Sequence, residues 1–251
     1  MAPNAQAQKV HDELFPGYKS KLAVTDPELV EVFGNFAFDE VLQLSKLEPR
    51  TRLMVQLAAI IASQAVQEYR VMLGAALTVG VTPIEVKEIV YQAVPYIGIA
   101  KVVDFLHATN EVLEGKGVGL PLPAQSRTTP ETRAEKGLAV QKQIVGEEGL
   151  KKLLLSAPED QQHIHRFLAA NCFGDYVSRA GIDLRTRELL TFSMLVALGG
   201  CEPQVKGHVA ANLKVGNNRL LLIDVLTQLL PFIGYPRTLN GLRCVDEAAA
   251  L

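Results

Sequence analysis

The amino-acid sequence predicts an all-α protein that contains two tandem helical units. Two observations predict this fold: one pattern of residues occurs twice in the chain, and the long apolar runs have few turn residues within them. In addition, the strict alternation of apolar and polar residues that marks strands is nearly absent. Each half of the chain is therefore expected to fold as a similar set of packed helices.

The repeat is clearest toward the end of each half. VYQAVPYIG, residues Val90–Gly98, matches LTQLLPFIG, residues Leu226–Gly234, at a glutamine, a proline, an isoleucine and a glycine, 136 residues apart. Upstream, Arg50–Arg52 recurs as Arg185–Arg187 after 135 residues, which implies one inserted residue between the two elements. The sequence is thus interpreted as one duplicated unit.

A segment rich in Gly, Pro, Ser and Thr separates the two halves. Such composition is typical of a linker between folded units. We therefore expect a first unit over residues 1–115, a linker over 116–132 and a second unit over 133–251.

Each unit is expected to contain one helix that is buried on nearly all sides. The runs Glu48–Ser63 and Asp183–Leu198 read as helices, and their inner parts, Leu53–Ile61 and Leu189–Leu198, are apolar nearly all round. Helices of this kind lie in a bundle core or against another subunit.

A helix end and a helix start follow in each unit. Gly80 is typical of a helix stop, and Thr82 is expected to be the N-cap of the next helix, with Pro83 in its first position. Glu85 stands at the third position and completes a capping box. Asn217–Asn218 is expected to do the same in the second unit.

Composition and charge argue against several function classes. With 48% hydrophobic residues, 21% charged residues and a net charge of −2, the chain has no basic stripe for nucleic acid. Its longest apolar stretch, Leu189–Gly200, is too short for a membrane span, and its N-terminus lacks a signal-peptide core. Three separated cysteines favour a reducing, cytoplasmic location, and neither a metal site nor a cofactor is expected.

The stretch GGCEPQVKGH, Gly199–His208, brings a cysteine, a glutamate and a histidine close together in the sequence, more than any other stretch of the chain. The two glycines should end the preceding helix, and Pro203 favours a new helix that starts at Cys201 or Glu202. Positions seven apart on a helix differ by about 700°, so Cys201 and His208 are expected to share one face. The helix N-terminus is then expected to lower the pKa of Cys201, and His208 can move a proton near neutral pH.

Two interpretations of this face stay open. In the first unit, Ala65 stands at the place of Cys201 and Met72 at the place of His208, and both are apolar. Cys201 and His208 therefore either form a site that only the second unit has, or are tolerated members of a core. Asn212 lies on the same predicted face.

Three further residues are candidates for substrate binding. Arg185 and Arg187 can hold a carboxylate through two parallel hydrogen bonds. Because Arg50 and Arg52 recur in the first unit, structural ion pairs are the favoured alternative. Tyr96 either lines a pocket or packs in the core.

Residues Phe173–Gly216 resemble the carboxymuconolactone decarboxylase family, which has the alkylhydroperoxidase D-like fold. The resemblance covers the aromatic-Gly-Asp element, LRTR, the apolar helix, the Glu…His segment and the closing Val-Gly turn. LEPRTRLMVQLAAIIAS and VYQAVPYIG give the first unit the same resemblance. It implies a tandem all-helical fold that assembles as a homo-oligomer, with a trimer of six units expected, or a dimer of such assemblies.

The resemblance also implies two chemistries. In the decarboxylases, which need no cofactor, the positions of His208 and Glu202 act as proton donors or orient the substrate. The alkylhydroperoxidase D branch uses a Cys-x-x-Cys pair with a glutamate upstream and a histidine downstream. Here Cys201 and His208 keep that spacing and Glu188 stands one residue off the glutamate's place, but Gln204 replaces the second cysteine.

Three hypotheses about function follow. The favoured one is a cofactor-independent acid–base enzyme that acts on a small carboxylated or lactone-type substrate, with His208, Cys201, Glu202 and Glu188 as candidate catalytic residues. The second is a thiol peroxidase with one reactive cysteine, Cys201. The third is a non-catalytic oligomeric module in which this face is buried at a subunit contact.

Overall fold

The computed structural model describes residues 2–250, and the elements in this range are helices. The first half contains α1 (Ala5–Leu14), α2 (Leu22–Thr25), α3 (Pro27–Asn35), the π-helical η1 (Phe36–Glu40), α4 (Val41–Gln43), α5 (Pro49–Ala62), α6 (Val66–Thr78), α7 (Pro83–Ile97) and α8 (Ile99–Gly115). The predicted all-α fold class is confirmed.

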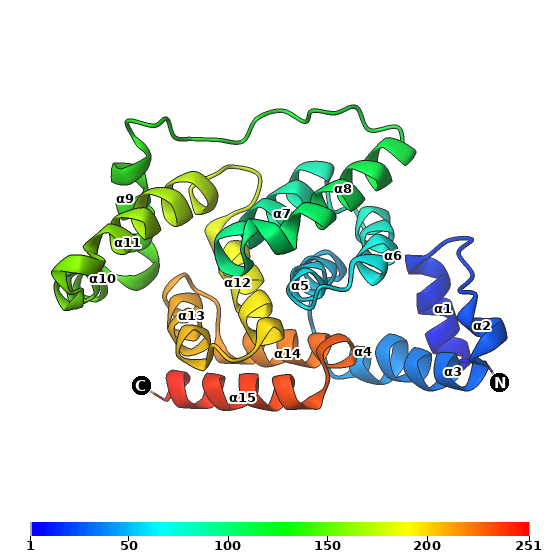
Figure 1. The fold of residues 1–251 in the computed structure, drawn as a ribbon. Helices are drawn as coiled ribbons and strands as arrows, with labels where there is room; N and C mark the ends of the chain where they lie inside the picture. Colours follow the sequence, from blue (N-terminus) through cyan, green and yellow to red (C-terminus); the bar gives the residue numbers. More distant parts are fainter. Residues whose placement is uncertain (1, 251) are drawn as a thin grey trace.

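The second half repeats this order of helices. It contains α9 (Arg133–Val145), α10 (Glu147–Ser156), the 3₁₀-helical η2 (Glu159–Gln161), α11 (Gln162–Phe167), the π-helical η3 (Leu168–Val177), α12 (Leu184–Leu198), α13 (Glu202–Lys214), α14 (Arg219–Ile233) and α15 (Tyr235–Ala249). Between α8 and α9 the chain crosses the top of the molecule with no helix (Figure 1).

The predicted helix ends and starts have the expected geometry. Thr82 accepts a hydrogen bond from the amide of Glu85, whose carboxylate accepts one from the Thr82 amide, which completes the capping box of α7. Asn218 caps α14 through the amide of Leu221. Gly199 ends α12 with a φ of +70°, a conformation that glycine adopts without steric cost.

The two units share one hydrophobic core. The all-round apolar helices α5 and α12 pack against each other in the middle of the molecule (Figure 1), and their buried side chains belong to a single cluster that draws on both units. Helices outside this core also make contacts between the two units. The η3 helix of the second unit contacts α7 of the first, and η1 and α4 of the first unit contact α14 of the second. Each unit therefore completes the surroundings of the other.

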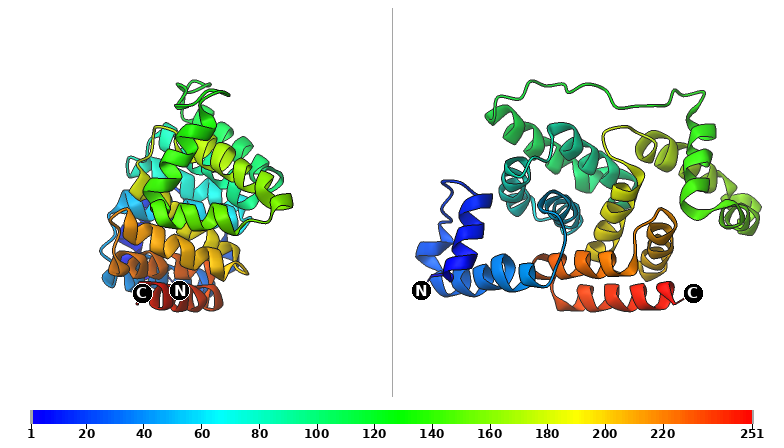
Figure 2. Two further views of the ribbon diagram at one scale, coloured as in Figure 1. Left: turned by 90° about the vertical axis from the view of Figure 1, so that its left-hand side faces the viewer. Right: turned by 180° about the vertical axis from the view of Figure 1, so that it is seen from behind.

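The first helices of the two units lie at opposite ends of the molecule (Figure 2). At one end, α9 crosses η3 with their backbones almost in contact. A Cβ atom added at Gly137 would lie 1.9 Å from the carbonyl oxygen of Ala169, and one added at Gly174 would lie 2.2 Å from that of Arg133. Glycine is required at this crossing because no side chain fits between the two segments.

Within residues 2–250, no helix combines the length and the apolar composition that a membrane crossing needs.

The crossing of α9 and η3 gives a first prediction. Gly174→Ala should lower the free energy of unfolding by about 1–3 kcal/mol, because its methyl group has no space. Gly74→Ala is the matched control: Gly74 lies within α6 with no atom within 4 Å of its added Cβ, so alanine should raise stability by about 0.5–1 kcal/mol. Urea unfolding measures both, and equal stabilities of the two variants would contradict this packing.

Candidate active site

The candidate site is built on a buried carboxylate and a partly exposed imidazole. Nδ1 of His208 on α13 lies 2.8 Å from Oε2 of Glu188 on α12. The Glu188 side chain is 1% exposed, whereas that of His208 is 18% exposed. The carboxylate of the pair is therefore buried, whereas the imidazole reaches the surface.

Amide side chains hold α13 against α12 at this point. The Asn212 Nδ2 group donates to the carbonyl oxygens of Glu188, at 3.0 Å, and His208, at 2.7 Å. Asn217 donates in turn to Oδ1 of Asn212, at 2.8 Å, and to the carbonyl oxygen of Arg185, at 3.0 Å. Asn212 is fully buried. It thus acts on the backbone that carries the Glu188–His208 pair, and its predicted contact with substrate stays a prediction.

Tyr96 brings the first unit into the site. Its ring, at the end of α7, meets the His208 ring edge-on, with 5.7 Å between the centroids and an angle of 76°. Burial, together with the nearby Cys172 and Glu188, raises the pKa of Tyr96 well above its usual value. The phenol is therefore neutral at physiological pH.

Cys172, on η3, belongs to this cluster, although the sequence did not predict it. Burial raises the pKa of its thiol to about 12, a hydrogen bond with Tyr96 acts in the opposite direction, and the Glu188 charge raises it further. No sequence signal marked Cys172, because its proximity depends on the contact of η3 with α7 of the other unit. The Tyr96 phenol beside His208 and the Cys172 thiol beside Tyr96 are therefore both neutral.

Cys201 does not share a hollow with His208. Its Sγ donates to the carbonyl oxygen of Leu195, at 3.3 Å, and it lines a cavity of about 20 Å³ against α15, together with Glu202 and Cys244. The expectation of a lowered pKa is wrong: burial first, and then the charges of Glu202 and Cys244, raise the pKa of Cys201. The structure therefore separates Cys201 and Glu202 from the Glu188–His208 pair.

Arg185 performs the same structural task as its counterpart in the first unit. Its Nη2 donates to the carbonyl oxygen of Gly216, at 3.1 Å, just beyond the end of α13. Arg50 donates through Nε to the carbonyl oxygen of Gly80, also at 3.1 Å, just beyond α6. Arg185 is nevertheless exposed and stands one helical turn before Glu188, on the same face of α12.

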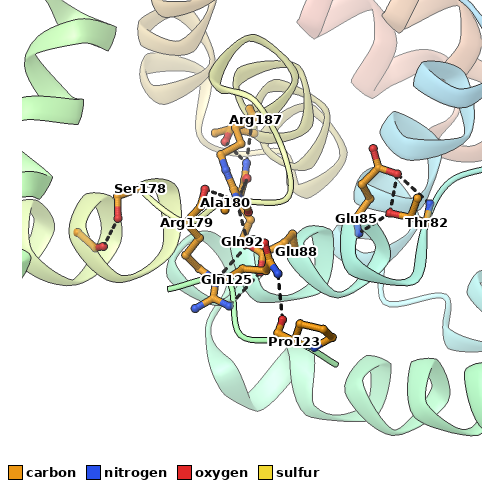
Figure 3. A network of polar contacts seen from close by, with 12 residues as sticks. Thr82, Glu85, Glu88, Gln92, Pro123, Gln125, Ser178, Arg179, Ala180 and Arg187 are labelled. Atoms are coloured by element: carbon orange, nitrogen blue, oxygen red, sulfur yellow. Dashed lines mark hydrogen bonds and ion pairs between the residues drawn. The ribbon is translucent and has the colours of Figure 1, made fainter. Parts of the chain in front are cut away.

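Arg187 is enclosed in an ion-pair network between the two units (Figure 3). It is 1% exposed, and its Nη2 lies 2.8 Å from Oε2 of Glu88 on α7. Its Nη1 donates to Gln92, at 2.8 Å, and Nη2 also meets the carbonyl oxygens of Arg179 and Ala180, both at 3.1 Å. The structure gives the Arg187 guanidinium protein partners, and does not bring it together with the Glu188–His208 pair.

Comparisons with known proteins agree with this architecture. A sequence model of the carboxymuconolactone decarboxylase family matches residues 27–111 and again residues 162–247. The chain belongs to the carboxymuconolactone decarboxylase family. The double match also confirms the tandem repeat that the sequence predicted.

Two known proteins illustrate the likeness. Over 117 residues, the chain is 26% identical to 4-carboxymuconolactone decarboxylase of Acinetobacter baylyi, and the match covers 47% of this chain and 87% of that protein. A solved structure from Burkholderia xenovorans LB400, named after a gamma-carboxymuconolactone decarboxylase subunit, aligns with a TM-score of 0.54 and 22% identity. This alignment covers 99% of the present chain and 98% of the other, and it supports the shared fold.

The family match occurs twice, but the acid–base pair occurs once. At the repeat spacing, Leu53 and Met72 occupy the places of Glu188 and His208. Both are buried core residues. Within residues 2–250, moreover, no group of three or more His, Cys, Asp or Glu side chains is placed to hold a metal ion.

The buried network predicts a large effect of Glu88→Gln. The variant removes the one carboxylate between Arg179 and Arg187, and we expect it to lower the free energy of unfolding by about 3–5 kcal/mol. Glu247→Gln removes an exposed ion pair with Lys206 and should leave stability nearly unchanged. Urea unfolding compares them, and a nearly neutral Glu88→Gln would show that Arg187 does not depend on this partner.

The surroundings of Cys201 predict slow alkylation by iodoacetamide at pH 7. Because its pKa is raised above the usual value of 9.0, the rate should keep rising beyond pH 9 as the thiolate forms. Cys201→Ser identifies the signal, since Cys172 and Cys244 are buried. A rate that levels off below about pH 8 would contradict the raised pKa.

Proposed function

We propose that the protein is a cofactor-independent acid–base enzyme that acts on a small carboxylated or lactone-type substrate. The observation that carries this proposal is the 2.8 Å contact between His208 and the buried Glu188 carboxylate. A carboxylate behind a histidine is the arrangement that prepares an imidazole for proton transfer.

Glu188 is proposed as the positioning residue of the pair. By accepting a hydrogen bond from Nδ1–H, it fixes the imidazole tautomer and leaves Nε2 as the atom that exchanges protons. Its negative charge also stabilises the imidazolium form when Nε2 takes up a proton. Asn212 then serves the chemistry through the backbone of both helices.

The proposed reaction is a decarboxylation. As the substrate's carbon–carboxylate bond breaks, carbon dioxide leaves and the electron pair moves into an adjacent carbonyl system as an enolate. The proton on Nε2 of His208 is then transferred to the carbon, and solvent restores the imidazolium. Arg185, exposed and one turn from Glu188, is proposed to hold a substrate carboxylate, and the Tyr96 ring forms one wall.

The thiol peroxidase alternative receives less support. It needs a thiolate at Cys201 near neutral pH, whereas burial and the Glu202 charge raise the pKa of that thiol. Cys201 and Glu202, both candidates in the sequence analysis, are therefore left out of the proposed acid–base step.

The acid–base proposal predicts that His208→Gln and Glu188→Gln each lower kcat by at least about 10²-fold, because each removes proton transfer or its orientation. The substrate for the assay is 4-carboxymuconolactone, which the Acinetobacter relative's name indicates, and carbon dioxide release is measured. Cys201→Ser is the control and should keep its activity. Equal, measurable turnover in wild type and His208→Gln would reject the proposed role of His208, and loss of turnover in Cys201→Ser would show that the reaction depends on this thiol.

We also propose that the chain works as a cytoplasmic homo-oligomer, with a trimer of six units as the expected form. Large apolar side chains are exposed on the last two helices, among them Leu220, Tyr235 and Leu239, which a subunit contact would cover. The Burkholderia neighbour is itself named as a subunit. The three free cysteines fit a reducing compartment.

A further inference from the structure

The first unit contains a cavity that is open to solvent and distinct from the candidate active site. It has a volume of about 630 Å³ and lies between α1, α2, α3, η1 and α6. All of its lining residues belong to the first unit, whereas the Glu188–His208 pair lies on α12 and α13. In Figure 1 the cavity-forming helices α1 to α3 stand at the far side of the molecule from α13. A volume of this size suits a small organic ligand.

The second unit shows why space remains here. There α9 lies directly on η3 through Gly137 and Gly174. At the repeat spacing, Asp39 stands in place of Gly174, and its carboxylate accepts a hydrogen bond of 2.9 Å from the Asn4 side chain at the start of α1. A side-chain contact thus joins α1 to η1 where close backbone contact joins α9 to η3.

Aromatic rings form much of the cavity wall. The Phe38 ring meets Phe15 at 5.9 Å and Phe33 at 6.0 Å, both in edge-on geometry. All three rings line the cavity together with Tyr18. Rings packed in this way present a flat apolar surface to a ligand, and their faces attract cations.

The polar lining carries more carboxylates than ammonium groups. Glu68 on α6 lines the cavity and is accessible to solvent there, while desolvation by the surrounding protein raises its pKa. Among the side chains that the structure describes (residues 2–151, 155 and 157–250), none forms a hydrogen bond or an ion pair with its carboxylate. Asp12, also in the lining, is kept ionised by hydrogen bonds from His11 and Gln8, which lower its pKa. Lys19 is the lysine of the lining.

We propose that this cavity binds a hydrophobic amine, a ring-bearing molecule whose protonated nitrogen pairs with the Glu68 carboxylate. The aromatic wall packs against the ring of the ligand. The carboxylate pairs with the ammonium group and so offsets the hydration that the cation loses in the cavity. A carboxylic acid of the same size would meet Glu68 and Asp12 as like charges. The first unit, which lacks the acid–base pair, thus has a ligand site of opposite charge preference to the one proposed in the second unit.

The experiment compares three probes of nearly equal size by titration calorimetry: 2-phenylethylammonium, 2-phenylethanol and 3-phenylpropionate. For the wild-type protein, we expect the amine to bind about tenfold more tightly than the alcohol, and the acid more weakly than both. In Glu68→Gln the amine should lose this advantage, while the affinity for the alcohol stays within about twofold. His208→Gln should bind the amine as wild type does, which separates this site from the proposed active site.

Several results would overturn the proposal. The first is that none of the probes binds, as expected if another copy of the chain fills the cavity. The second is that amine and alcohol bind equally to the wild type. The third is that the preference for the amine survives in Glu68→Gln. A Val71→Trp variant, which fills the space beside Glu68, should abolish binding of both amine and alcohol, and unchanged affinity would place the binding elsewhere.

Discussion

The packing of α5 against α12 is the contact on which the rest of the structure depends. Both helices carry apolar side chains around most of their circumference, so either one would expose them to water if its unit stood alone. Their mutual burial joins the two units in one core. It also fixes α12, and with it the buried side chains of Arg187 and Glu188, against the first unit.

The two units share hydrogen bonds that stabilise the fold, but they differ in the residues at the position of the acid–base pair. Arg50 and Arg185 each donate a hydrogen bond to the glycine carbonyl beyond α6 and α13, respectively, so this support is common to both units. The pair Glu188 and His208, in contrast, has only apolar counterparts. The first unit still serves the site of the second, because Tyr96 contacts His208 across the boundary between the units.

The sequence predicted His208 and Glu188 as candidates but paired His208 with the wrong partner. The rule that places residues seven apart on one face holds only for residues inside a helix. Cys201 is the N-cap of α13, with a φ of −136° and a ψ of 40°, so the rule does not apply to it. Its thiol turns toward α15 instead. The helix N-terminus was expected to lower its pKa, but desolvation outweighs that effect.

The sequence by itself determined what depends on neighbours along the chain: the helix caps at Thr82 and Asn218, the break at Gly199, the apolar helices and the repeat. These follow from backbone geometry and side-chain periodicity, which are local properties. Only the tertiary structure decided which polar groups meet. Glu88 and Arg187, 99 residues apart, form a buried ion pair because two units pack together, and desolvation and nearby charges depend on that packing.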